Sequence, residues 1–375
     1  MLAIGIMSGT SLDGIDVCVV DIKKNIKYEY SIKAFISTPY SEEIVKKIKE
    51  VSNLETSNVQ KICSLNVELS YEYVKAINEC LSLYNIKKDD IEFIAMHGQT
   101  IWHNPDNMDG FSSSTLQIGD PSIVAYAFNK KVISNFRMMD MAAGGCGAPL
   151  IPFVDYLLYS SSEKSIAMQN IGGIGNVCYM KKNSSIDEIV AFDTGPGNMM
   201  IDEAMKILFN KSYDENGNVA KEGNIDREVL NELLSDEYLK RPYPKSTGRE
   251  KYNTEFVNNI INEIINNGGK KEDVISTITA FTAYSIIDAY DNFLEDIDEV
   301  IVSGGGSHND YLMDILKNKY KDKVIVENRT DAFEAFGFAI LGHMTLLNEP
   351  SNVPVVTNAK RRVVLGNITN PPYKE

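Results

Sequence analysis

The chain has 375 residues, of which 43% are apolar and 24% charged, a mixture that indicates a globular protein and excludes disordered, collagen-like and fibrous chains. At about 150 residues per domain, this length predicts two domains. With 37 basic and 52 acidic residues the net charge is −15, so nucleic acids and anionic membranes are poor partners because their phosphates are repelled. A nucleotide is not excluded, since a local group of backbone N–H donors can bind its phosphates.

The first half of the chain begins with strands and continues with alternating helices and strands. Two apolar runs on either side of the turn-rich segment Ser8–Gly14 predict a hairpin with a long loop. The predicted strands are Leu2–Met7, Ile15–Ile22, Ile26–Ile36, Ile91–Met96 and Val132–Ser134. The predicted helices are Ser41–Val51, Ser57–Leu83 and Ser122–Asn129.

The second half repeats this order. Its predicted strands are Ser165–Asn170, Asn176–Met180, Glu188–Phe192, Val300–Ser303 and Val324–Glu327. Its predicted helices are Gly197–Phe209, Asn253–Asn267, Glu272–Leu294, Ser307–Lys317 and Ala332–Leu347. Because both halves begin strand–turn–strand, the sequence predicts two α/β domains of the same kind, with a seam near Val132–Asn135.

The cysteine pattern indicates a reducing compartment. The five cysteines are odd in number and contain no C-x-x-C pair, so neither a disulfide framework nor a zinc knuckle is expected. The apolar N-terminus has no basic leader and is interpreted as a buried strand, not a signal peptide. No run of 18 apolar residues occurs, so no transmembrane helix is predicted. We therefore expect a cytoplasmic protein.

Glycine is concentrated at the ends of predicted strands. Eleven of the 25 glycines fall in four short clusters. These are Gly144, Gly145 and Gly147; Gly172, Gly173 and Gly175; Gly195 and Gly197; and Gly304, Gly305 and Gly306. Glycine lets backbone N–H groups approach a phosphate or a base closely, so four such clusters favour a nucleotide cleft over ordinary turns.

The loop after the first strand carries groups suited to phosphate and to a cation. Its residues are Ser8, Gly9, Thr10, Ser11, Leu12, Asp13, Gly14, Ile15 and Asp16. The hydroxyls and glycines would bind phosphate, and Asp13 and Asp16 would belong to the shell of a magnesium ion. The loop is not a P-loop, because no Gly-Lys-Ser/Thr follows. A hairpin turn with Asx-type hydrogen bonds explains these residues equally well.

Two later glycine segments also follow strands. Asp193 would project from the carboxyl end of its strand, the usual ligand position in α/β sheets, or it would cap the next helix. The segment around Gly172 and Gly173 is interpreted as a second hairpin loop. A purine or ribose would rest against the bend at Gly304–Gly306 and the helix N-terminus after it.

The segment from His97 to His103 contains two of the four histidines and the only tryptophan. No third ligand lies at a familiar spacing, so we do not expect these histidines to bind a metal. A polar sugar-binding loop with an aromatic wall, including Gln99 and Thr100, is the preferred interpretation.

Arg137 and Cys146 are candidates for contact with a substrate. Arg137 would bind a carboxylate through two hydrogen bonds, or form a salt bridge with Asp140. Cys146 lies in a glycine bend with no histidine nearby in the sequence, so it is interpreted as a small packing residue and not as a nucleophile.

With these residues in place, the chain resembles the anhydro-N-acetylmuramic acid kinases. Seven motifs stand in the order seen in that family, from Leu2 to about Leu341. The motifs are Ile6–Asp16, His97–Thr100, Gly147–Leu150, Asn170–Gly173, Phe192–Pro196, Lys245–Glu250 and Ser303–Asn309. Two positions depart from the family pattern, because Asn135 stands where Asp is expected and Cys146 where Gln is expected.

The resemblance implies two similar actin-like (RNase H-like) α/β domains, each with a mixed five-stranded sheet flanked by helices, and an ATP cleft between them. We expect residues 1–132 with about 346–375 in the first domain and residues 133–345 in the second. The resemblance also implies ATP and Mg²⁺ as cofactors, a cytoplasmic role in cell-wall recycling, and suggests a homodimer.

The implied reaction opens the anhydro ring of 1,6-anhydro-N-acetylmuramic acid with water and phosphorylates O6, giving N-acetylmuramate 6-phosphate. The family's base falls on the motif of Asp193, and general-base help of this kind contributes roughly 10²–10⁴-fold. The loops at Gly9–Asp16 and Gly172–Gly175 would hold the phosphates. Glu334 would bind a sugar hydroxyl, or remain a solvated charge at a helix N-terminus.

Two rival functions share parts of this pattern. Another sugar or acid kinase of the same fold would keep the phosphate loops and differ at Gln99, Arg137 and Glu334. A non-enzymatic actin-like ATPase would need an assembly surface or a client-binding domain. The two predicted domains leave no spare segment large enough to form such a domain.

Overall fold

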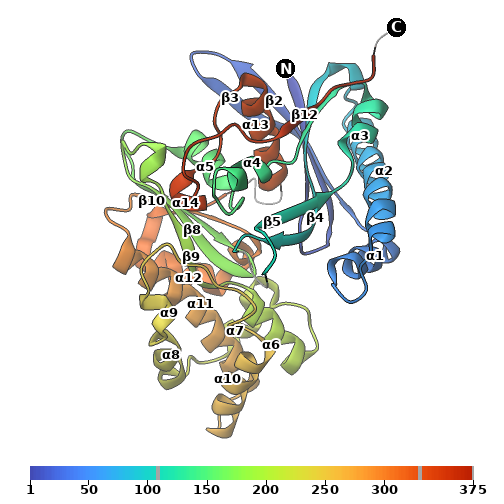
Figure 1. Ribbon diagram of the computed structural model, residues 1–375. Helices are drawn as coiled ribbons and strands as arrows, with labels where there is room; N and C mark the ends of the chain where they lie inside the picture. The colour runs from blue at the N-terminus through green and yellow to red at the C-terminus, as the bar shows by residue number, and fades with distance from the viewer. Residues whose placement is uncertain (107–109, 328–331, 374–375) are drawn as a thin grey trace. The chain divides into compact units, whose positions relative to one another are not determined.

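Two β-sheets organise the chain in the computed structural model, and each lies in a unit of its own (Figure 1). The structure describes residues 1–106, 110–327 and 332–373. The first unit comprises Met1–Val154 and Asp331–Glu375, and the second comprises Asp155–Thr330. These boundaries differ from the expected ones at residues 132/133 and about 345/346, because the segment after the last central strand and the helix α13 (Phe333–Leu347) pack with the first unit.

The first unit contains a seven-stranded mixed sheet in the order β12-β6-β4-β1-β2-β3, with β5 added beside β4. Its strands are β1 Leu2–Ser8, β2 Gly14–Lys24, β3 Tyr28–Pro39, β4 Ile91–Asn104, β5 Ser114–Ile118, β6 Lys131–Ser134 and β12 Asn367–Thr369. The expectation of five strands is wrong for this sheet, since β5 pairs with an extended β4 and β12 pairs with β6. The segment from His97 to His103 therefore lies on β4 and is not a loop.

Helices cover both faces of this sheet. They are α1 Glu42–Ser52, α2 Val59–Leu83, α3 Pro121–Phe128, α4 Met138–Ala142, α13 Phe333–Leu347 and α14 Pro354–Thr357. The helix α5 Ile151–Tyr159 contains the boundary between the two units, after Val154. Ile4 and Ile6 of β1 belong to the buried cluster that includes the α2 residues Leu65 and Leu69. Gly5, between them, faces α13, because alternate residues of a strand point to opposite faces.

Gly5 shows why α13 can lie so close to β1. A Cβ atom at this position would be 1.8 Å from the carbonyl oxygen of Ala335. Gly342, near the C-terminal end of α13, allows a similar close approach to β4, since its Cβ would be 2.6 Å from the Cβ of Ala95. Glycine at these contacts lets the helix backbone approach the sheet, as close helix–strand packing requires.

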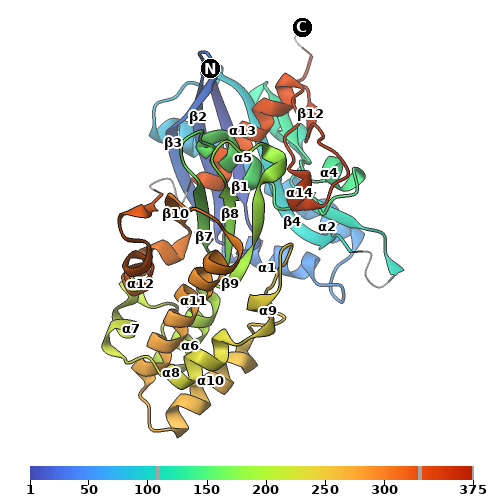
Figure 2. The ribbon, with the colours of Figure 1, turned by 90° about the vertical axis from the view of Figure 1, so that its left-hand side faces the viewer.

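The second unit contains a five-stranded mixed sheet in the order β11-β10-β7-β8-β9. Its strands are β7 Ile166–Ile171, β8 Ile174–Met180, β9 Val190–Pro196, β10 Glu299–Ser303 and β11 Val324–Val326. Its helices are α6 Met199–Phe209, α7 Asn218–Glu222, α8 Arg227–Leu234, α9 Glu237–Lys240, α10 Thr254–Asn266, α11 Lys271–Phe293 and α12 Asp310–Tyr320. Figure 2 shows α6, α8, α10 and α11 gathered into one helical group, which shares a single buried apolar cluster.

The central five strands of the two sheets have the same topology. In the first sheet, β1 pairs antiparallel with β2 and parallel with β4, while β2 and β3 are antiparallel and β4 and β6 parallel. In the second, β7, β8, β9, β10 and β11 repeat each of these pairings in the same order. This repetition confirms two α/β domains of one kind. No helix among the described residues is long and apolar enough to span a bilayer.

Candidate active site

The loop between β1 and β2 is a tight turn followed by a packed glycine. The N–H of Leu12 donates to the carbonyl of Gly9 over 3.4 Å, and Leu12 has a φ of +63°, a conformation that costs energy for a residue other than glycine. Gly14 is required by packing, because its Cβ would be 2.3 Å from the carbonyl oxygen of Thr38. Gly9 has no such neighbour, and the nearest atom to its Cβ would be Ser11 Oγ at 3.5 Å. The backbone at Gly9 is therefore open to close approach by a ligand.

Gln99 is hydrogen-bonded through its side chain to the backbone of this loop. Its side chain is fully buried. Its Nε2 donates to the carbonyl of Gly9 over 3.1 Å and to that of Thr100 over 3.3 Å, and its Oε1 accepts from Tyr40 Oη over 3.3 Å. These bonds use the polar atoms of the amide inside the protein. The structure thus gives Gln99 a role in shaping the loop, while the neighbouring Thr100 is only half-buried.

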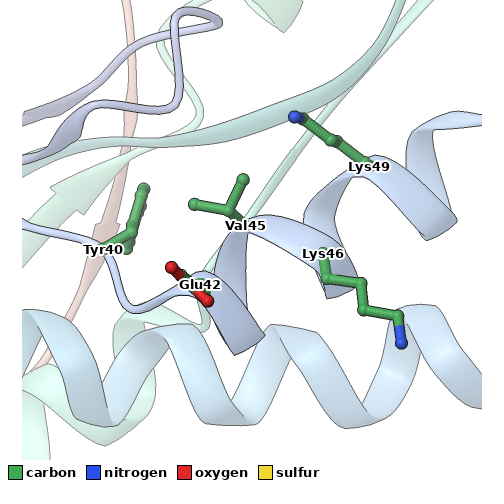
Figure 3. A pocket seen from close by; sticks show the side chains of 5 residues that line it. All are labelled: Tyr40, Glu42, Val45, Lys46 and Lys49. Carbon is green, nitrogen blue, oxygen red and sulfur yellow. The ribbon is translucent and has the colours of Figure 1, made fainter.

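Tyr40 borders a surface hollow of about 400 Å³ at the start of α1, lined also by Glu42, Val45, Lys46 and Lys49 (Figure 3). Burial raises the pKa of the Tyr40 hydroxyl to about 12, so it stays protonated and can donate to Gln99. The amino ends of Lys46 and Lys49 point in different directions in Figure 3. The hollow therefore does not present a paired cationic site for an anion.

Arg137 is held by two neighbours of the first unit. Its Nε donates to His97 Nε2 over 3.0 Å, and its Nη1 donates to the carbonyl of Gly147 over 2.9 Å. Because His97 Nε2 accepts this hydrogen bond, it carries no proton and the ring is neutral. Its Nδ1 lies 2.7 Å from the carbonyl of Gly98 and is therefore the nitrogen that carries the N–H. Burial, and then the charge of Arg137, lower the pKa of His97 to about 3. Both ring nitrogens are thus engaged, and no group of metal ligands occurs among the described residues.

Arg137 does not form the alternative salt bridge with Asp140. The buried carboxylate of Asp140 instead accepts bonds from the Gly147 N–H at 2.8 Å and from Asn352 Nδ2 and Thr357 Oγ1 at 2.7 Å each. Asp140 therefore fixes the same residue, Gly147, whose carbonyl receives the guanidinium.

Glu334 lies in the first turn of α13 and is exposed to solvent. The pKa of its carboxyl is nevertheless raised, first because surrounding protein displaces water and then because Asp16 is nearby, while Arg137 acts in the opposite direction. Burial lowers the pKa of Arg137, and Glu334 counters that effect. Glu334 therefore lies within electrostatic range of both Asp16 and Arg137.

The two departures from the family pattern lie beside this group. Asn135 has a φ of +57°, a left-handed conformation that Asn tolerates better than most residues. Cys146 is half-buried, and burial raises the pKa of its thiol. A thiol that stays protonated is a poor nucleophile, which agrees with its interpretation as a packing residue.

In the second unit, three glycine segments meet at Asn198. The carbonyl of Gly172 accepts from the Asn198 N–H over 2.7 Å, and Asn198 Nδ2 donates to the carbonyl of Ile171 over 3.3 Å. A Cβ on Gly305 would lie 3.3 Å from the same Nδ2. The hydroxyl of Ser307, buried just beyond this bend, has no hydrogen-bond partner among the described residues. These loops together form a surface of backbone and small polar groups.

Not every glycine here serves the same purpose. Gly195 has a φ of +145° and would clash with Ser285 Oγ at 2.9 Å, and Gly304 and Gly306 would meet Ile171 at 2.6 and 2.3 Å. Close packing therefore explains why these three positions are glycine. Gly172 and Gly173 have no atom closer than 3.6 Å to a Cβ, so packing does not explain them.

Asp193 is half-buried on β9 and is held from three directions. Its Oδ2 accepts from the Thr247 N–H over 3.0 Å, its N–H donates to the carbonyl of Lys245 over 3.2 Å, and its carbonyl accepts from Tyr238 Oη over 2.8 Å. Burial raises the pKa of its carboxyl to about 6, Glu250 adds to this, and the bond from Thr247 opposes it. Asp193 is not a helix cap, because Asn198 is the residue before α6.

Sequence reasoning did not foresee several of these supporting residues. His97 stood in a quoted motif, whereas Asn198 lies two residues beyond the Phe192–Pro196 motif. The partners of both are distant in the chain and cannot be read from spacing. Tyr238 lies outside every motif. The Lys245–Glu250 motif was the available signal for Thr247 and Lys245, whose backbone holds Asp193.

Comparison with known proteins gives a consistent result. The sequence profile of the family described as "Anhydro-N-acetylmuramic acid kinase" matches residues 1–371. Proteins with that name from Clostridioides difficile (strain 630) and Bacillus cereus (strain B4264) are 45% and 44% identical, and each comparison covers 100% of this chain and 99% and 98% of the relative. Among solved structures, the Acidaminococcus fermentans (R)-2-hydroxyglutaryl-CoA dehydratase component A is 13% identical over 91% of this chain and 96% of its own, with a TM-score of 0.47.

Proposed function

Because the chain belongs to the anhydro-N-acetylmuramic acid kinase family, we propose that it opens the 1,6-anhydro ring of anhydro-N-acetylmuramic acid with water and transfers the γ-phosphoryl group of ATP to O6. The product is N-acetylmuramate 6-phosphate, with ADP. The observation that carries the residue assignment is Asp193, a half-buried carboxyl that accepts a bond from Thr247 and lies opposite Asn176 on the neighbouring strand β8.

Asp193 is the general base in this proposal. As water attacks C1, a C1–O bond forms, the C1–O6 bond breaks, and the water proton passes to the carboxylate. A base is most effective when its pKa lies near the working pH. The pKa of about 6 leaves Asp193 ionised at neutral pH and yet more basic than an ordinary carboxylate.

Phosphoryl transfer needs alignment and charge neutralisation more than covalent help. The O6 released from C1 attacks the γ-phosphorus, and the bond to ADP breaks. Open backbone at Gly9 in the first unit would donate to phosphate oxygens. In the second unit, open backbone at Gly172 and Gly173 and the Ser307 hydroxyl would do the same. Asp13 and Asp16 supply oxygen donors of the kind that Mg²⁺ accepts alongside phosphates. When bound, Mg²⁺ would neutralise charge on the phosphates.

The sugar side of the site lies with Arg137, Glu334 and Thr100 in this proposal. The guanidinium, fixed by His97 and Gly147, would bind the lactyl carboxylate of the substrate. Glu334 would accept a bond from a sugar hydroxyl. We further propose that the enzyme acts in the cytoplasm, in recycling of the cell wall, and as a homodimer.

Mass spectrometry of the product tests the function. With anhydro-N-acetylmuramic acid and ATP in ¹⁸O-water, we expect one ¹⁸O at C1 and the phosphate on O6. Asp193→Asn should retain ATP binding and lose about 10²–10⁴-fold in turnover. A phosphorylated sugar with its anhydro ring intact would contradict the proposal, and activity on a different sugar alone would favour another kinase of the same fold.

A further inference from the structure

Lys245 is an almost buried lysine whose charge the reaction above does not use. Only 6% of the residue is exposed. Its Nζ donates to the carbonyls of Leu239 over 2.8 Å and Tyr238 over 3.3 Å, both residues of α9. It takes part in none of the salt bridges found among the described residues.

Aromatic rings replace a carboxylate as partners of this ammonium group. The Nζ atom lies 4.6, 5.1 and 5.4 Å from the ring centroids of Phe293, Tyr238 and Phe192. Such contacts stabilise a cation that has lost water. Burial lowers the pKa of the Lys245 amine to about 8, and Asp288 is the charge that opposes this. A buried lysine without a carboxylate partner is costly, so a reason for keeping it is needed.

The backbone around Lys245 provides that reason. The carbonyl of Lys245 accepts from the N–H of Asp193, and two residues later the N–H of Thr247 donates to the Asp193 carboxylate. Tyr238, whose carbonyl the ammonium binds, donates its hydroxyl to the carbonyl of Asp193. The Lys245 side chain thus ties α9 to the segment 245–247, and both hold Asp193.

We propose that Lys245 is a positioning residue for the reaction, which sets the Asp193 carboxylate by clamping α9 to the segment 245–247. This inference rests on the proposed role of Asp193 as base. The ammonium acts through the backbone, because burial, the Thr247 N–H and Glu250, and not the charge of Lys245, shift the pKa of Asp193.

Lys245→Met is the test variant, and Lys251→Met its matched control. Methionine keeps the length of the lysine stem and packs well against aromatic rings, so the variant should fold. Lys251 also lies near the Tyr238 ring, at 5.9 Å, but binds the Asp236 carboxylate at the start of α9 and no atom that holds Asp193. Each variant removes one lysine whose side chain contacts α9 or its N-cap Asp236.

We expect kcat of Lys245→Met to fall about 10- to 100-fold, as misplacement of a reacting group by an ångström does, with KM for sugar and ATP nearly unchanged. Lys251→Met should keep kcat within about twofold, because its partly buried ion pair with Asp236 includes no atom that is bonded to Asp193. The acid limb of the kcat–pH profile should also move. The bond from the Thr247 N–H lowers the pKa of Asp193, whereas burial and Glu250 raise it, and Tyr238 and Tyr252 are its other titratable neighbours. If the bond from Thr247 is loosened, the pKa of Asp193 rises. The acid limb of the profile then shifts to higher pH.

A merely structural lysine would lower the melting temperature and leave the pH profile in place, and that result would overturn the inference. Equal loss of kcat in both lysine variants would also overturn it. Tyr238→Phe, which removes the second bond from α9, provides an independent measure, since its effect on kcat should be non-additive with that of Lys245→Met. If Asp193→Asn retained full activity, the base assignment itself would fail, whatever Lys245→Met showed.

Discussion

At the scale of single residues, the structure removes one of the two partners that the sequence allowed for Arg137. The sequence allowed a substrate carboxylate or Asp140 as its partner. Asp140 is instead fully engaged by Gly147, Asn352 and Thr357. The guanidinium is fixed by a neutral histidine and a carbonyl, neither of which neutralises its charge. It therefore keeps positive charge for an anionic ligand in a protein that is acidic overall.

Arg137→Lys should raise KM for the anhydro sugar by about 10- to 150-fold, which corresponds to the 1.5–3 kcal/mol of a charge-assisted pair. KM for ATP should hardly change. Lysine lacks the planar fork that can bind a carboxylate while still reaching His97 and Gly147. Steady-state kinetics measure this, with Arg362→Lys, an exposed arginine of the same unit, as the control. An unchanged sugar KM together with a lower melting temperature would make Arg137 structural.

Polarity in the sequence singled out the candidate residues of this site but did not divide them into those that would touch a ligand and those that support it. Gln99 and Arg137 stand out equally as polar residues in an apolar context. Burial separates them, because Gln99 is fully enclosed and satisfied by Gly9, Thr100 and Tyr40. Burial depends on tertiary packing, so one sequence cannot reveal it.

At the scale of elements, apolar periodicity in the sequence predicted the helices whose own residues specify a buried face and an N-cap. The helices α1, α2 and α11 carry long apolar stripes and, for α1 and α2, side-chain N-caps at Ser41 and Asn58, and all were predicted. The strands β5 and β12 were missed. β12 has three half-exposed or exposed residues, and each strand exists because a partner offers a free edge. Pairing of that kind leaves little trace in the sequence.

The bends at Gly9 and Gly305 provide a test of nucleotide binding. Gly9 and Gly305 lack the close contacts that fix Gly14 and Gly304. Gly9→Val should leave the melting temperature nearly unchanged and weaken ATP binding, because a branched side chain blocks approach to the backbone. Gly305→Val should act similarly after a small shift of Asn198, whose Nδ2 would be 3.3 Å away.

Calorimetric titration with ATP, alongside a melting curve, checks both variants. Gly14→Val is the contrasting case, since its Cβ would strike the carbonyl of Thr38 at 2.3 Å and should lower stability. If ATP affinity stayed at the wild-type value in both Gly9→Val and Gly305→Val, these bends would not form the nucleotide site.

At the scale of the whole molecule, the chain builds one sheet topology twice. Strand pairing that is antiparallel, antiparallel, parallel and parallel recurs from β1–β6 to β7–β11. The repeated strand–turn–strand openings were visible in the sequence. The return of the chain after residue 330 to complete the first unit was misplaced, because α13 is apolar nearly all round and its pattern does not say which sheet it covers.

The completion of the first unit by its C-terminal part depends on one buried carboxylate. Asp140, which is 0% exposed, joins the bend at Gly147 to Asn352 and Thr357. Backbone bonds follow on either side, from Cys146 to Thr357 and from Lys360 to Ala143.

Asp140→Ala would remove an acceptor that three buried donors share, and each donor left unsatisfied costs about 1–3 kcal/mol. Asn352 Nδ2 keeps its bond to the carbonyl of Arg361 and Thr357 Oγ1 its longer bond to the carbonyl of Val353, whereas the Gly147 N–H loses its acceptor. Part of this cost will be relieved by water, so we expect a loss of about 2–4 kcal/mol in the free energy of unfolding. The exposed Asp89 of the same unit provides the control, since Asp89→Ala should change stability by less than about 0.5 kcal/mol. Hydrogen exchange followed by mass spectrometry should show faster exchange in residues 143–147 and 352–360, with β7 and β10 of the second unit as protected as before. Uniform loss of protection in both units, or none in either segment, would show that Asp140 does not hold the C-terminal part in place.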